Sequence, residues 1–262
     1  MKYIDKYKEY ISFLNKNSER LLKDDNWDIL FQTLPLLKIS NGYTLDDYRS
    51  KKSTNNILQL YARKTDTRRP SEETLKRYDE TNGFCGVVRR IMFNFDFIDK
   101  VKIAEDDEEI ENNDETEKTI DELLNLPEKI LPEEVVTLNF IPDAIWQAYL
   151  LKTTNYYIGQ RWHGGYHEIT IPGNLEELKK FNPWKEEEIR EYEKFIEEIK
   201  FDFEPKITIK GNVATIEHLA VFFHNRISRC QATVVYDIKT RRIESFNFDS
   251  VDLFKFTPYC IF

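Results

Sequence analysis

Cysteine, glycine and proline are all scarce in this 262-residue chain, which contains three, eight and nine of them. Three cysteines without a Cys-x-x-Cys pair do not indicate a disulfide framework, so nothing in the sequence demands an oxidising compartment. So few glycines and prolines exclude collagen-like and low-complexity structure. We therefore expect a cytoplasmic protein.

Long apolar runs are missing as well. No stretch approaches the roughly 20 apolar residues that a helix needs to cross a bilayer. The first residues alternate charged and aromatic side chains, so they lack the apolar centre of a signal peptide. The sequence predicts a soluble chain without a membrane segment.

The common signatures of catalysis are also absent. The sequence has no Gly-x-Ser-x-Gly elbow, no phosphate-binding glycine loop and no dinucleotide fingerprint. Cys85 lies in Gly-Phe-Cys-Gly without a neighbouring base that would activate its thiol, which favours a small buried cysteine over a nucleophile. An enzyme is the less favoured class, and we expect no cofactor.

The chain is rich in aromatic and charged residues. Its 18 Phe, 14 Tyr and 4 Trp supply enough apolar area for a substantial core, so the chain is not disordered as a whole. We expect a single α+β domain over residues 1–262. An acidic insertion interrupts it at about 104–118, and the alternative is a division into 1–103 and 119–262.

One short run of the chain contains nine acids, as many as the net charge of −9. Nine acids and no base occur there, so the rest of the chain has as many acids as bases. The nine acids are Glu105, Asp106, Asp107, Glu108, Glu109, Glu111, Asp114, Glu115 and Glu117. Such a run is typical of a solvated loop at a sheet edge, and it also suits the attraction of a basic partner.

Nucleic acid is not an expected partner. Outside the acidic run the chain has as many acids as bases, so it lacks the basic face that neutralises phosphates. The three Arg pairs are scattered at 68–69, 89–90 and 241–242. The partner that the charge favours is a basic protein.

Helices are predicted near the start of the chain and in its second half. Ile4, Tyr7, Ile11 and Leu14 form one stripe at helical spacing, and Ile189, Tyr192, Ile196 and Ile199 form another. A second helix is expected from about residue 25 to Pro35, and Asn174 is a predicted N-cap. Residues 143–151 fit either a helix or a strand.

Strands fill much of the remainder. Aromatic-rich strands are predicted at 57–63 and 87–97, and the last sixty residues read as an antiparallel meander. Its four strands are expected at 206–210, 213–223, 230–238 and 243–248. The segregation of helices from antiparallel strands indicates an α+β fold rather than βαβ units.

The densest cluster of polar recognition groups is Arg-Trp-His-Gly-Gly-Tyr-His-Glu at 161–168. Two glycines allow a sharp turn there. A binding pocket on this loop would be lined by Trp162, His163, Tyr166, His167, His218 and His224. A tight turn in which these side chains bond to backbone is the competing interpretation.

A metal site is not expected. His163 and His167 are weak candidates, because a His-x-x-x-His pair serves a metal best on a helix and Gly-Gly disfavours one.

The sequence thus leaves three functional hypotheses. The leading one is a protein-binding module, such as an immunity protein or antitoxin, that presents the acidic loop and an aromatic surface. The alternative is a small-molecule enzyme or binding protein with the His/Trp/Tyr pocket around 161–168. The third is a structural subunit whose exposed aromatics form an oligomer interface. The oligomeric state is left open.

Overall fold

The computed structural model describes seven stretches of the chain. They cover residues 2–24, 27–49, 58–66, 132–158, 169–181, 185–222 and 226–255. The acidic run at 105–117, the predicted strand at 87–97 and the loop at 161–168 lie outside these residues, as do Cys85 and His224.

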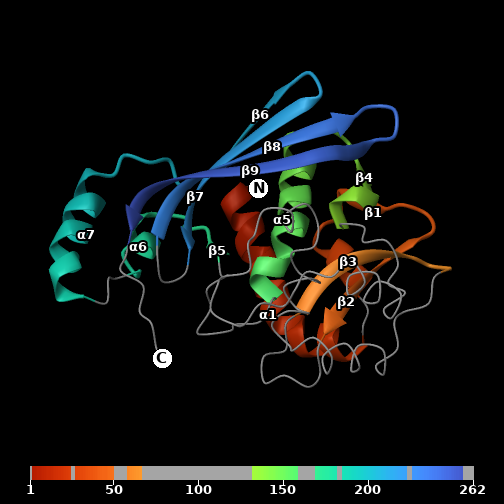
Figure 1. Ribbon diagram of the computed structural model, residues 1–262, viewed down its shortest axis with the longest axis horizontal. Helices are drawn as coiled ribbons and strands as arrows, with labels where there is room; N and C mark the ends of the chain where they lie inside the picture. Colours follow the sequence, from red (N-terminus) through yellow and green to blue (C-terminus); the bar gives the residue numbers. More distant parts are fainter. Residues whose placement is uncertain are drawn as a thin grey trace, which may run out of the picture.

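An antiparallel sheet of seven strands organises the fold (Figure 1). Strands β1, β4, β9, β8, β7 and β5 follow one another in space, and β6 pairs with the first half of β7, on the edge whose far end pairs with β5. In chain order these strands are β1 (Leu37–Ile39), β4 (Val136–Leu138), β5 (Ile169–Thr170), β6 (Lys206–Lys210), β7 (Val213–Phe222), β8 (Arg226–Asp237) and β9 (Arg242–Lys255).

The meander formed by β6 to β9 confirms the α+β prediction for the last part of the chain. Its turns are set locally: Gly211 adopts a φ of +62°, which glycine tolerates, and connects β6 to β7. Between β8 and β9 the Asp237 carboxylate accepts hydrogen bonds from Lys239 N and Thr240 Oγ1, both at 2.8 Å. Arg241 completes this turn with a φ of 58°.

The two faces of the meander bury different clusters. Ala214 and Ile216 of β7 join a core with helices α1 (Tyr3–Asp24) and α5 (Pro142–Ile158). Leu219 and Val221 have the opposite parity along the strand, so they lie on the other face. There they pack with α6 (Leu175–Leu178) and α7 (Glu186–Glu198). Helices therefore cover both faces, with α7 at one end (Figure 1).

Helix α1 follows its predicted stripe. Ile4, Tyr7 and Leu14 are buried, and Ile11 packs against the same core. The next element is shorter than expected, because residues 27–32 form the 3₁₀ helix η1 (Trp27–Gln32). Asp28 in its first turn accepts hydrogen bonds from Leu45 N at 3.0 Å and Thr44 Oγ1 at 3.2 Å.

These two bonds attach η1 to a separate hairpin. Strands β2 (Tyr43–Arg49) and β3 (Leu58–Lys64) pair only with each other among the described residues. Leu45, Leu60 and Ala62 of the hairpin are buried in the main core. The buried strand predicted at 57–63 is thus present as β3.

Helix α5 resolves the ambiguous segment at 143–151. Every residue from Ala144 to Leu151 is buried, since η2 (Pro132–Val135), β1, β3, β6 and α1 all contact it. A helix that is buried all round shows no amphipathic stripe, which explains the ambiguous pattern. Within the described part of the chain, no helix combines the length and apolarity that a membrane crossing requires.

Candidate functional site

His218 is the one residue of the predicted pocket that lies in the described structure. Its Nε2 is 2.5 Å from Tyr149 Oη, and its Nδ1 is 3.0 Å from the carbonyl oxygen of Leu219. A carbonyl only accepts, so Nδ1 carries the ring proton and Nε2 accepts from the tyrosine hydroxyl. Both ring nitrogens are therefore engaged within the protein.

His218 is buried among aromatic side chains. Its ring lies edge-on to Tyr149 and Trp146, with centroid distances of 5.2 Å and 6.2 Å. Burial lowers the pKa of His218 to about 4, against an ordinary value of 6.5. In the described structure this histidine is a neutral, hydrogen-bonded core residue, and a pocket at 161–168 and 224 remains a prediction.

Removing the tyrosine hydroxyl tests this hydrogen-bond assignment. Tyr149→Phe leaves His218 Nε2 buried without its donor, so we expect the free energy of unfolding to fall by about 1–2 kcal/mol. Urea denaturation measures the change. Tyr236→Phe is a matched control, because it removes a buried hydroxyl that donates to the carbonyl of Leu138 at 2.8 Å without contacting His218. The NMR signals of the His218 ring nitrogens should change only in Tyr149→Phe.

A second polar group is buried beside this aromatic cluster. Glu133 of η2 is buried and forms an ion pair with Lys152 of α5. Burial raises the pKa of Glu133, although the lysine opposes the shift. Lys152 Nζ also lies 5.9 Å from the ring centroid of Phe246, which stacks on Tyr149 at 6.0 Å. The pair thus joins η2, α5 and β9.

A third polar cluster lies where β8 begins and β9 ends. Ser228 Oγ donates to Asp252 Oδ1 at 2.8 Å, and Arg226 Nε and Lys255 Nζ approach the same carboxylate at 3.5 Å and 3.2 Å. Partial burial raises the pKa of Asp252, but Ser228 and the two cations outweigh it, so the pKa is lowered overall. The carboxylate is therefore ionised, and it contacts Ser228, Arg226 and Lys255.

Cys230 is buried next to this cluster. Burial raises the pKa of its thiol to about 12, so it is protonated at neutral pH and is a poor nucleophile. Among the described residues no group of histidines, cysteines and carboxylates has the geometry of a metal site. The cluster around Asp252 joins the start of β8 to the end of β9.

The structure does bring the flanks of the predicted pocket together. Ile169 directly follows the 161–168 segment, and Phe222 lies two residues before His224. Ile169 and Phe222 are register partners of β5 and β7, so both segments start from the same corner of the sheet. Sequence reasoning could not detect this pairing, because β5 is only two residues long.

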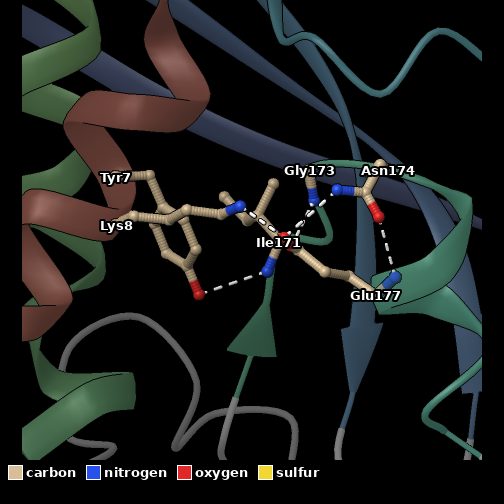
Figure 2. A network of polar contacts seen from close by, with 6 residues as sticks. All are labelled: Tyr7, Lys8, Ile171, Gly173, Asn174 and Glu177. Carbon is tan, nitrogen blue, oxygen red and sulfur yellow. Dashed lines mark hydrogen bonds and ion pairs between the residues drawn. The ribbon is translucent and has the colours of Figure 1, made fainter.

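A polar network holds this corner against α1 (Figure 2). Tyr7 Oη accepts from Ile171 N at 3.2 Å, and Lys8 Nζ lies 2.5 Å from Glu177 Oε1. Glu177 also accepts from Gly173 N at 2.8 Å, while its own N–H donates to the predicted N-cap Asn174 at 2.9 Å. The start of α6 is thereby fixed against the N-terminal helix.

The most distinctive exposed surface lies around α7, which packs on the same face of the sheet as α6. Helix α7 carries seven glutamates and two bases in 13 residues, a net charge of −5. Its inner side packs on β9, where Phe254 lies 5.4 Å from the Tyr192 ring and 5.2 Å from the Phe195 ring. Three large apolar side chains that precede Phe254 in β9 are exposed: Phe248, Val251 and Leu253. We call α7 and residues 247–253 of β9 the α7/β9 surface.

No protein-family model matches this chain, and neither a curated protein nor a solved structure is similar to it at a significant level.

Proposed function

We propose that this chain is a protein-binding module that recognises a basic partner through the α7/β9 surface. The observation that carries the proposal is the exposure of large apolar side chains on both faces of β9, the strand on which the strongly acidic helix α7 packs through Phe254. Exposed apolar side chains with a charged rim are typical of protein interaction sites. An immunity protein or antitoxin that masks a basic toxin is one concrete case.

Charge supports a basic partner over an acidic or neutral one. The glutamates of α7 that face away from the sheet are exposed, among them Glu187, Glu191 and Glu198. The acidic run at 105–117 lies outside the described residues, and we propose that it adds to the same attraction. Complementary charge of this kind speeds association and suppresses wrong partners.

Charge reversal on α7 tests the proposal. The tagged chain is used to purify a basic partner from its source cells, and the affinity of the purified pair is then measured. Glu187→Lys with Glu191→Lys should weaken binding about tenfold or more at low salt, because both residues lie on one exposed helix face. Deleting residues 105–117 should weaken it further.

The control keeps the total charge the same. Glu9→Lys with Glu176→Lys changes the net charge equally, and both residues are exposed on other helices. This variant should retain nearly normal affinity. Equal weakening by the two double variants, or none by either, would show that the α7/β9 surface does not bind the partner.

The alternative function is a small-molecule enzyme or binding protein with its pocket on the 161–168 segment. The register pair Ile169 and Phe222 favours it, since it joins the flanks of that segment and of His224. Thermal-shift screening of metals and metabolites against the wild-type chain and a His163→Ala, His167→Ala variant tests this candidate. A ligand that stabilises only the wild-type chain supports it.

A further inference from the structure

Resting on the proposed function, we infer that the partner contributes an extended basic segment, which adds as a new strand to the outer edge of β9. Strand addition is an established mode of recognition in which main-chain hydrogen bonds supply affinity and alternate side chains supply specificity. It requires an open strand edge, apolar contacts on both faces of the sheet, and a charge that suits the incoming chain.

The second half of β9 has an open edge among the described residues. β9 spans 14 residues and pairs with β8 along one side. On its other side it forms a register pair with β4, Arg242 with Thr137, and η2, which directly precedes β4, also contacts β9. Beyond η2, the described part of the chain supplies no further strand to this edge. The later residues of β9 are thus available for pairing.

Apolar side chains are exposed on both faces of this edge. Phe248 lies opposite Ala232, and Val251 lies opposite Arg229. Because the two positions differ by three residues, Phe248 and Val251 point to opposite faces. Their side chains are 45% and 62% exposed. A strand added beside β9 would cover both, whereas a helix or loop packed on one face would cover only one of them.

The strand lacks two of the features that protect natural sheet edges. Edges are usually guarded by lysines, prolines or bulges. β9 has no proline, and its single lysine is at its last residue, Lys255. Two register irregularities mark bulges in β9 at Glu244 and at Leu253. We therefore place the added strand on residues 247–252, between η2 and the second bulge.

Charge decides between a basic segment and a second copy of this chain. Two copies would each bring a net charge of −9, and pairing their β9 edges would bring the Asp249 carboxylates of both strands into one small interface. Like charges across paired strands are destabilising. A basic segment instead meets Asp249 on the strand and the glutamates of α7 at its end.

A synthetic peptide of alternating lysine and valine, about six residues long to match the open edge, tests the inference. In one register its valines lie beside Phe248 while its lysines lie on the face of Asp249 and α7. Fluorescence anisotropy should show binding that weakens with added salt. A peptide of alternating glutamate and valine should bind at least about tenfold more weakly.

Backbone methylation isolates the strand pairing. A lysine-valine peptide methylated on every lysine amide keeps one edge of N–H groups and should still bind, whereas one methylated on every amide should not. Phe248→Lys should weaken binding of the unmodified peptide about tenfold. Ile238→Lys is the matched control, because Ile238 is 70% exposed in the turn before β9 and should not contact the peptide.

The possible results are distinct. Equal binding of the unmodified and fully methylated peptides, equal loss in both lysine variants, or no peptide binding at all would overturn strand addition. The affinity of the α7 charge variants for the purified partner would still decide the proposed function separately. A dimer in light scattering that Phe248→Lys abolishes would show that a second copy occupies the edge, which would also overturn the inference.

Discussion

Replacing Lys152 with methionine is expected to lower the free energy of unfolding by about 3 kcal/mol near neutral pH. The change leaves the Glu133 carboxylate buried without its cation, and breaking a buried ion pair costs about 3–5 kcal/mol. The Lys152 side chain is 31% exposed, so solvent screening places the cost at the lower end of this range. Urea denaturation with circular dichroism measures it.

The pH dependence of this variant has a defined sign. Burial raises the pKa of Glu133, and removing Lys152 removes the group that opposes the rise. A carboxyl whose folded pKa exceeds its unfolded value destabilises the fold at high pH and less so as pH falls. The variant should therefore recover stability relative to the wild-type chain as the pH falls below neutral.

Adding Glu133→Gln to Lys152→Met supplies the control. The double variant has no buried charge, so it should regain most of the lost stability at pH 7 and show no recovery on acidification. A double variant as unstable as Lys152→Met alone would mean that the lysine acts through packing on Phe246 rather than through the ion pair.

Acidification is expected to cost the wild-type fold about 2 kcal/mol through His218 between about pH 7.5 and pH 5. The folded pKa of about 4 lies below the ordinary value of 6.5, so the unfolded chain binds a proton that the folded chain excludes. The stabilisation is complete above about pH 6.5 and is lost as pH falls toward 4.

His218→Gln separates this effect from the titration of the carboxylates. Glutamine does not titrate, and its amide oxygen can accept the hydrogen bond from Tyr149. We expect the variant to lose less than half as much stability as the wild-type chain over the same pH interval. If the unfolding free energies of the two proteins changed in parallel with pH, His218 would be protonated in the folded state and would not be excluded from solvent.

Periodicity made much of the fold predictable. The stripe from Ile4 to Leu14 identified α1, and the alternation from Val213 onward identified the meander. The side chain of Asn174 caps α6, as its position in the sequence indicated. These elements depend on local patterns, in which a half-buried helix or strand shows its inner face in the sequence.

Other features depend on contacts between distant residues. The identity of α5 was hidden because its neighbours bury it on all sides, and β9 extends beyond its expected end because β8 pairs with it as far as Lys255. The ion pair of Glu133 with Lys152 joins elements whose proximity no spacing reveals. The core position of His218 likewise follows from the packing of α5 on β7.

The candidate site divides in the same way. Sequence reasoning emphasised the acidic run at 105–117 and the 161–168 cluster, which both lie outside the described residues. It did not identify the acidic outer face of α7 or the exposed edge of β9. The glutamates were visible as ordinary helix surface, and the exposure of Phe248 and Val251 depends on which strands flank β9.

Hydrogen exchange along β9 tests whether a basic segment pairs with the outer edge of this strand. The full chain is exchanged alone and with saturating lysine-valine peptide, and amide protection is compared across the meander by mass spectrometry. We predict that residues 247–252 gain protection while β6 and the β6–β7 turn do not, because only the outer edge of β9 acquires new main-chain hydrogen bonds. Unchanged exchange in β9 under saturating peptide would contradict binding at this edge.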